Sequence, residues 1–544
     1  MPDKYIEKLL RDEKEDVKEI GQALGLSQKP KEPNEKSKER KREIVIFVFF
    51  FLIALAVRLY SLFYITTPQN AGIEGWYSDV YHHWQIAYLT KTVGLHQGFL
   101  RLWDLKGLEY FWGLIHPLAG VVLITITKTA SIVPFRLLSA VSGSFAIAVL
   151  FLIVKKYWGI QAGFAAALIA VFNPVGIFSD ASGMVEPLGI AFVLLAIYLI
   201  YNQPFLSGFL FALASMTRAE YWVLSVCIIA CLVIIRVKKI NRPLLLLGYL
   251  IPIFVYMKYL LDWTGNPIYP VWWNYMGNSV GVWQKEILPN VSQLFAQKIY
   301  WVISALSILG VIYVFVKKPK SSPFLLFGFG NWLAWGVVIG MTKYLLSYLP
   351  RFWVDRIMLW PYMFLGSLFS ILLFGYLRKI VSRGLKVTFS TFAWITTVLS
   401  ILVLQFLWKP IHFYYDPTQK DFDNFKIMAQ EVGKHDTKQG KILFPELWPP
   451  FTYMMVYYEG VMGDRIIGQM FDPFYYMGDE DEVFKNWGEN RQKIKTWLEE
   501  EDIRLLIQVK DNKRYNMLID TEPDWFEYLG EVRNVDLYKV WPKN

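Results

Sequence analysis

Acidic and histidine side chains gather directly after the first apolar run of the chain. Glu74, Asp79, His82 and His83 lie close together there, and Asp79 precedes the two histidines by three and four residues. A helix would present Asp79 and both histidines on one face, where they could line a cavity. The carboxylate could act as a general base toward an acceptor hydroxyl, or could hold a divalent cation. The alternative is that Asp79 only caps the helix and that both histidines lie on the surface. A zinc site at the two histidines would need more ligands, and no cysteine or further spaced histidine completes the set.

Two further charged clusters follow later in the chain. Asp180 and Glu186 flank a short polar segment, and Arg218 and Glu220 lie two residues apart. Ionisable groups are costly in a membrane unless they are paired or face water, so their position at the ends of apolar runs favours a functional site. Glu186 could complete a polar cavity with Asp79, or could only stabilise the positive end of a helix. Arg218 could bind a phosphate, or could neutralise Glu220.

Two arginines precede a late apolar run. Arg351 and Arg356 carry guanidinium groups, which donate paired hydrogen bonds to two oxygens of a phosphate. A contact with lipid headgroups, or a salt bridge to Asp355, is the alternative. The sequence shows no glycine-rich phosphate loop, so we expect no nucleotide cofactor.

The composition places these residues in a membrane protein. The chain has 544 residues, of which 54% are hydrophobic and 19% are charged, and its mean hydropathy is +0.31. Apolar runs of about 20 residues, enough to cross a hydrocarbon core, recur along it. The net charge of +10 comes from short basic clusters between these runs, where they set topology. A nucleic-acid partner is therefore not expected.

Charge also predicts the topology of the first part of the chain. Residues 1–43 are expected to be cytoplasmic, with an amphipathic helix near 4–25 and then a linker, because a basic cluster precedes the first span at 44–65. The next region, 66–133, is then a large external loop. Its apolar stretch 113–127 is expected to lie in the outer interface, because a crossing there would move every later basic cluster to the wrong side.

The remaining apolar runs complete a prediction of eleven spans. After the first span they are 134–154, 162–178, 186–201, 205–217, 221–235, 243–261, 298–316, 323–342, 357–377 and 387–407. An odd number of spans returns the chain to the outside. The predicted fold class is thus an all-α membrane domain over 44–407, followed by a small external α/β domain over 408–544.

The last region shows the alternating pattern of a small α/β domain. Strands are predicted at Lys441–Phe444, Arg465–Gln469, Ile503–Val509 and Leu537–Trp541, and helices at 419–433 and 482–500.

The order of these features resembles the GT-C superfamily of integral membrane glycosyltransferases, which take a sugar from a polyprenyl phosphate carrier on the non-cytoplasmic face. The resemblance covers about residues 44–407. The matching features are the acidic loop with Glu74 and Asp79, the interfacial stretch led by His116 and Pro117, the loop with Asp180 and Glu186, the segment Thr217 to Glu220, and Arg351. The resemblance implies that Asp79, or Glu74 as the alternate, is the catalytic base or a metal ligand. It also implies that Arg351 or Arg356 holds the lipid phosphate.

The chain could resemble either of two branches of the superfamily. The oligosaccharyltransferase catalytic subunits bind a divalent metal, which implies Mg²⁺ or Mn²⁺ on Asp79, Asp180 and Glu186. Their Trp-Trp-Asp signature is absent here, and the nearest stretch is Glu446-Leu447-Trp448. This departure favours the branch of the protein mannosyltransferases and aminoarabinose transferases, which use single sugars.

The resulting hypothesis is an inverting transferase of the hexosyltransferase type at the cell membrane. It would use a polyprenyl-phosphate-linked (for example dolichyl-phosphate) sugar and a protein, lipid or glycan acceptor. The alternatives are transfer from a lipid-linked oligosaccharide, and a transporter or flippase of lipid-linked sugars. The halves of the chain lack the corresponding interrupted helices typical of transporters.

Overall fold

The structure is a computed structural model that describes most of the chain. The described residues are 33–65, 78–94, 113–234, 240–272, 319–321, 323–326, 328, 359–381, 385–408, 419–446, 448–461, 463–468, 474, 477 and 480–541. Three of the predicted site residues, Glu74, Arg351 and Arg356, lie outside these ranges. The chain forms two compact units, residues 1–49 and 50–544.

Four described helices are long and apolar enough to cross a membrane. They are α2 (Pro33–Tyr60, continued by the π-helical turn η1, Ser61–Ile65), α6 (Val133–Trp158), α12 (Arg242–Thr264) and α20 (Lys386–Trp408). An α-helix rises about 1.5 Å per residue, so each can reach across a hydrocarbon core of about 30 Å. The membrane class predicted from composition is therefore supported by the geometry of these helices.

Two predictions about helix bounds are wrong. The linker expected before residue 44 is helical from Pro33 onward, because Pro is tolerated in a first turn and the Lys, Glu and Arg that follow are good helix formers. The single span expected at 162–178 is two helices, α7 (Ile160–Val171) and α8 (Pro174–Ala181), which meet at 58°. Pro174 has no N–H to continue α7, and the Asn173 side chain accepts the Val175 N–H and caps α8 instead.

The other apolar helices are shorter. They are α5 (Ile115–Thr127), α9 (Glu186–Leu199), α10 (Pro204–Ser215), α11 (Ala219–Ile234) and α18 (Leu359–Ser370) with the π-helical turn η3 (Ile371–Leu377). The short helical elements are α19 (Arg378–Ile380), η2 (Pro319–Ser321), η6 (Gly463–Arg465) and η9 (Pro523–Trp525). The predicted span 298–316 and most of 323–342 lie outside the described ranges, so the total of eleven spans stays a prediction.

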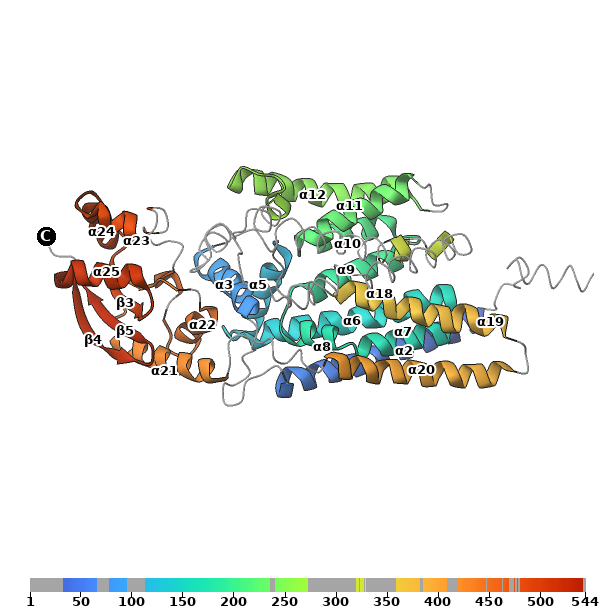
Figure 1. The fold of residues 1–544 in the computed structure, drawn as a ribbon. Coiled ribbons are helices and arrows are strands. Elements are labelled where there is room, and N and C mark those ends of the chain that lie inside the picture. Colours follow the sequence, from blue (N-terminus) through green and yellow to red (C-terminus); the bar gives the residue numbers. More distant parts are fainter. Residues whose placement is uncertain are drawn as a thin grey trace, which may run out of the picture. The chain divides into compact units, whose positions relative to one another are not determined.

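The membrane helices pack in a continuous series. In the order α12, α10, α9, α6, α7, α18, each helix contacts the next (Figure 1). Helices α10 and α12 cross with their backbones touching: a side chain on Gly208 would collide with the carbonyl oxygen of Leu245, and one on Gly248 with that of Phe205. Such small-residue contacts are typical of helices that associate in lipid, where close van der Waals packing replaces the hydrophobic effect.

The C-terminal region forms a mixed five-stranded sheet covered by helices, as the α/β prediction requires. The strand order is β2 (Ile466–Gly468), β1 (Lys441–Phe444), β3 (Ile503–Val509), β5 (Val535–Val540) and β4 (Phe526–Val532). Strands β1, β2 and β3 are parallel, whereas β5 runs antiparallel to β3 and β4. The helices are α21 (Gln419–His435), α22 (Pro449–Tyr457), α23 (Glu480–Lys485), α24 (Trp487–Glu500) and α25 (Lys513–Thr521).

One side of this domain shares its core with the predicted first external loop. That loop contains the helix α3 (Ser78–Val93), whose Tyr81 and Trp84 rings lie 5.2 and 4.8 Å from the ring of Tyr453 on α22. The Gln85 side chain of α3 also donates a hydrogen bond of 3.0 Å to Thr452. All five side chains are buried. The C-terminal domain therefore fixes α3, the helix that carries Asp79.

Candidate active site

Four segments that are distant in the sequence meet around Glu186. They are the first turn of α3, the start of α5, the turn between α8 and α9, and the turn between α10 and α11 (Figure 1). Each segment is the end of a helix or the turn between two helices. The site is therefore built at one end of the helix series, as the sequence predicts for its charged clusters.

The turn that leads into Glu186 is held by polar side chains of α6. Arg136 donates from Nε to the Ala181 carbonyl at 3.0 Å, and Ser139 donates to the Met184 carbonyl at 2.6 Å. Gly183 has a φ of 84°, and any side chain there would collide with Val80 of α3. The left-handed backbone and the lack of space both require glycine. Val80 follows Asp79 directly, so the turn brings α3 close to the segment that carries Glu186.

Glu186, Arg218 and Glu220 form a largely buried charged group. The Arg218 guanidinium lies between the two carboxylates, with Nη1 at 2.5 Å from Glu186 and Nε at 2.8 Å from Glu220. The side chains of these residues are only 7 to 15% exposed. The hydroxyl of Tyr221 donates to the Glu186 carbonyl at 3.0 Å. The predicted pairing of Arg218 with Glu220 is therefore present, and the group of three carries one net negative charge.

His116 is fully buried next to this group. The N–H of Ile115 donates to the Met216 carbonyl at 3.1 Å, which joins the start of α5 to the α10–α11 turn. In the described part of the chain, neither ring nitrogen of His116 has a hydrogen-bond partner. Burial lowers its pKa to about 4, against a smaller opposing effect of the Glu186 charge. His116 is therefore a neutral imidazole at physiological pH, with one unprotonated ring nitrogen.

This shifted pKa predicts a pH-dependent stability. Between its folded value of about 4 and its ordinary value of 6.5, the unfolded chain binds the extra proton, so stability falls as the pH is lowered through this window. The contribution of this group to the loss is roughly 3 kcal/mol. Thermal midpoints measured across the window should fall more steeply for the parent protein than for His116→Gln, which does not titrate. Equal slopes would contradict the buried neutral histidine.

The histidines of α3 are buried as well. His82 is 4% exposed and His83 is fully buried, with its ring centroid 5.1 Å from that of His116. The alternative that placed them on the surface is therefore wrong, because α3 is covered by α5 and by α22. Asp79 lies in the first turn of α3 and is partly exposed.

Asp180 pairs with an arginine of the first span. Arg58 is 1% exposed, and its Nε lies 2.9 Å from the Asp180 carboxylate. Its other nitrogens donate to the carbonyls of Val171 and Ala170, at 2.5 and 3.2 Å. These carbonyls lie at the end of α7, where the helix break removes their usual partners. Arg58 was not among the predicted site residues, although a single arginine inside the first apolar run was the available signal.

A metal site is not formed by the residues that the structure describes. Among them, no three His, Cys, Asp or Glu side chains cluster closely enough to hold a metal ion. Of the three carboxylates predicted as metal ligands, Asp180 is bonded to Arg58 and Glu186 to Arg218, so two of them have cationic partners. The described donor set therefore does not fit Mg²⁺ or Mn²⁺, which prefer several convergent oxygens.

Comparison with known proteins identifies the fold. No protein-family model matches the chain, and no curated protein matches its sequence. Among solved structures, the oligosaccharyltransferase of Archaeoglobus fulgidus in its apo form is 11% identical, with a TM-score of 0.52 over 89% of this chain and 73% of that one. ArnT from Cupriavidus metallidurans, an aminoarabinose transferase solved with undecaprenyl phosphate bound, is 12% identical, with a TM-score of 0.51 over 90% of this chain and 97% of that one. The chain therefore has the fold of these GT-C membrane transferases, which confirms the resemblance seen in its sequence.

Proposed function

We propose that this protein transfers a sugar from a polyprenyl-phosphate-linked donor to an acceptor on the non-cytoplasmic face of the membrane. The observation that carries the proposal is the buried group of Glu186, Arg218 and Glu220 beside His116, at the ends of apolar helices. Burying charges costs several kcal/mol per ion, and a purely structural helix end does not need them. The fold shared with two membrane sugar transferases supports the same function.

The reaction would be a direct displacement at the anomeric carbon. The acceptor oxygen attacks this carbon, the bond from the carbon to the phosphate oxygen breaks, and polyprenyl phosphate leaves with the bonding electrons. Asp79 accepts the acceptor's proton as a general base. A single displacement of this kind inverts the anomeric configuration. The leaving phosphate gains charge, which a guanidinium stabilises through paired hydrogen bonds.

Three arginines were predicted to hold this phosphate, and the structure describes one of them. Arg218 already contacts two carboxylates, so its charge is largely compensated. We therefore assign the phosphate contact to Arg351 or Arg356 and a positioning role to Arg218. In that role Arg218 holds the Glu186 and Glu220 side chains together through its two ion pairs.

The proposed sidedness is supported by the charges at the two ends of α6. Arg136 lies in its first turns beside the candidate site, and Lys155 and Lys156 lie in its last turn. The 26 residues of α6 separate these ends by about 39 Å. Because Lys and Arg in short loops favour the cytoplasm, the Lys155–Lys156 end is assigned to the cytoplasm and the site to the outside. The C-terminal domain, which packs on α3, then also lies outside.

A donor panel tests the proposal and separates it from its rivals. The purified chain in lipid nanodiscs would be incubated with polyprenyl-phosphate monosaccharides and, separately, with polyprenyl-diphosphate oligosaccharides, with and without chelator. We expect release of polyprenyl phosphate from a monosaccharide donor. Release only from the oligosaccharide donors would support the oligosaccharyltransferase alternative. Movement of the lipid-linked sugar between leaflets without bond cleavage would instead identify a flippase and contradict the proposal.

A further inference from the structure

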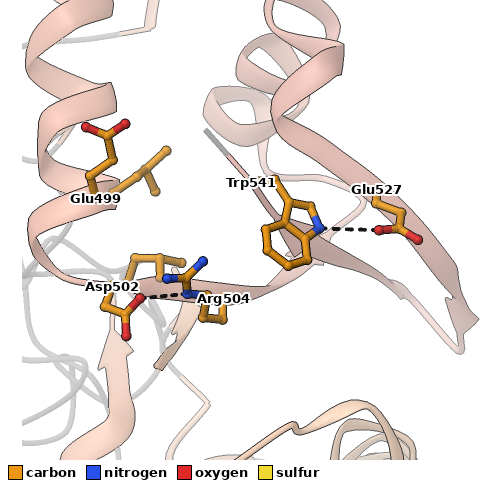
Figure 2. A pocket seen from close by; sticks show the side chains of 7 residues that line it. Glu499, Asp502, Arg504, Glu527 and Trp541 are labelled. Carbon is orange, nitrogen blue, oxygen red and sulfur yellow. Dashed lines mark hydrogen bonds and ion pairs between the residues drawn. The ribbon is translucent and has the colours of Figure 1, made fainter. Parts of the chain in front are cut away.

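A pocket of about 540 Å³ lies in the C-terminal domain, apart from the candidate active site. It opens between the end of α24, the start of β3, the strand β4 and the residue that follows β5 (Figure 2). Its polar lining consists of Glu499, Asp502, Arg504, Glu527 and Trp541. The volume lies within the range of roughly 300 to 1,000 Å³ that is typical of small-molecule sites. None of these residues belongs to the segments that meet around Glu186.

Hydrogen bonds join the polar groups of the pocket in pairs. Arg504 donates from Nε to Asp502 at 2.6 Å, and the indole N–H of Trp541 donates to Glu527 at 3.3 Å. The backbone N–H of Trp541 donates to the Trp525 carbonyl at 2.8 Å, which fixes the start of the side chain. Figure 2 shows Glu499 on one side of the pocket, Trp541 with Glu527 on the other, and the Asp502–Arg504 pair below them. Such preorganisation lowers the entropy cost of binding.

The charges of the pocket decide which ligands suit it. Three carboxylates face one arginine in the lining, so an anion would be repelled. Lys539 Nζ at 4.3 Å and Arg504 Cζ at 5.8 Å from the ring centroid of Trp541, together with Lys495 Nζ at 3.8 Å from Glu499, already compensate the carboxylates, so a cationic ligand would gain little. An apolar ligand would displace the water that hydrates these charged groups and would offer them no hydrogen bonds, which costs free energy. A neutral, hydroxyl-rich ligand meets none of these penalties.

We propose that this pocket binds a neutral saccharide. The hydroxyl groups of a sugar would donate to Glu499, Glu527 and Asp502 and accept from the Nη groups of Arg504, which the bond to Asp502 does not use. One C–H face of the sugar would lie on the indole ring of Trp541, which is 40% exposed. The Lys539 side chain would move off that ring as the sugar binds. This second saccharide site goes beyond the transfer site and shares no residue with it.

Ligand binding to the full chain tests this inference. Saturation-transfer difference NMR would be recorded on the protein in nanodiscs, free of sugar-based detergents, with neutral disaccharides of glucose, mannose and N-acetylglucosamine. We expect at least one disaccharide to bind with a millimolar dissociation constant. Trp541→Ala should weaken this binding about tenfold. Tyr528→Ala, which removes an exposed aromatic of β4 outside the pocket, should leave it unchanged.

Two further variants keep the result interpretable. If Trp541→Ala lowers the thermal midpoint, Glu499→Gln decides, because Glu499 is exposed and its ion pair with Lys495 is long, at 3.8 Å. Weaker binding supports the site and unchanged binding overturns it. Asp79→Asn should bind the disaccharide as the parent does, which separates this site from the transfer site. The inference is also overturned if no disaccharide binds at millimolar concentration, or if spermidine alone binds.

Discussion

Replacing Asp79 by asparagine is expected to slow sugar transfer by a factor of about 100 to 10,000, the usual contribution of a positioned general base. Asparagine has nearly the same size and shape but cannot accept the proton of the acceptor hydroxyl. Asp79 lies in the first turn of α3, next to Val80, which touches the turn before Glu186. The rate would be measured as release of polyprenyl phosphate from the best donor of the panel.

A matched control separates catalysis from folding. Asp520→Asn removes an exposed carboxylate of α25, far along the chain from the site, and should leave the rate unchanged. Thermal midpoints of both variants should equal that of the parent protein. Unchanged turnover in Asp79→Asn would remove Asp79 from its assigned role and direct attention to Glu74 or His116.

Replacing Arg58 by methionine is expected to destabilise the protein by about 3 to 5 kcal/mol, the cost of leaving a buried charge without its partner. The change leaves the Asp180 carboxylate buried without its guanidinium, and also removes one donor each from the Val171 and Ala170 carbonyls. The α8–α9 turn would lose its fixed position, so transfer should fall together with stability. The thermal midpoint in nanodiscs measures the first effect and the donor assay the second.

Two variants test the reason for this loss. Lys258→Met breaks an ion pair with Asp262 on α12 whose side chains are 70 and 49% exposed, and should cost less than about 1 kcal/mol. Arg58→Met combined with Asp180→Leu removes both charges and should recover part of the stability, because no unpaired charge remains. If the double variant is as unstable as Arg58→Met, the carbonyls of α7, rather than the charge, explain the effect.

The sequence predicted the C-terminal strands best where they are buried. Strands β1 and β3 have the predicted bounds, because Lys441–Phe444 and Ile503–Val509 are short apolar runs next to turn residues. Strand β4 was missed. It is an edge strand whose Glu527, Tyr528 and Glu531 are exposed, so its composition resembles that of a loop. Its position is fixed by pairing with β5, which local sequence does not report.

The break between α7 and α8 could have been predicted. Pro174 cannot continue the preceding helix, and Asn173 followed by Pro174 is a typical start of a new one. The prediction missed this pair because it lies within a long apolar run. The apolar stretch 113–127 contains a separate short helix, and its interfacial position stays a prediction. Helix α5 has 13 residues, about 20 Å in length, and packs on α3.

The long-range contacts of the site could not be predicted. Arg58 and Asp180 are 122 residues apart, and Gln85 bonds to Thr452 across 367 residues. No local pattern encodes such pairs, because they depend on how the helices pack. The sequence could show that ionisable residues lie at helix ends, and the structure adds that Glu186 and Arg218 are in contact.

The central claim is that the charged site and the C-terminal domain lie together outside the membrane, at the end of α6 opposite Lys156. Cys227 and Cys231, the two cysteines of the chain, would first be replaced by serine. Single cysteines at Thr127, Asp520 and Lys156 would then be labelled in intact cells with an impermeant maleimide. The account predicts labelling at Thr127 and Asp520 without permeabilisation, and at Lys156 only after it. Labelling of Thr127 and Asp520 from opposite sides would contradict it.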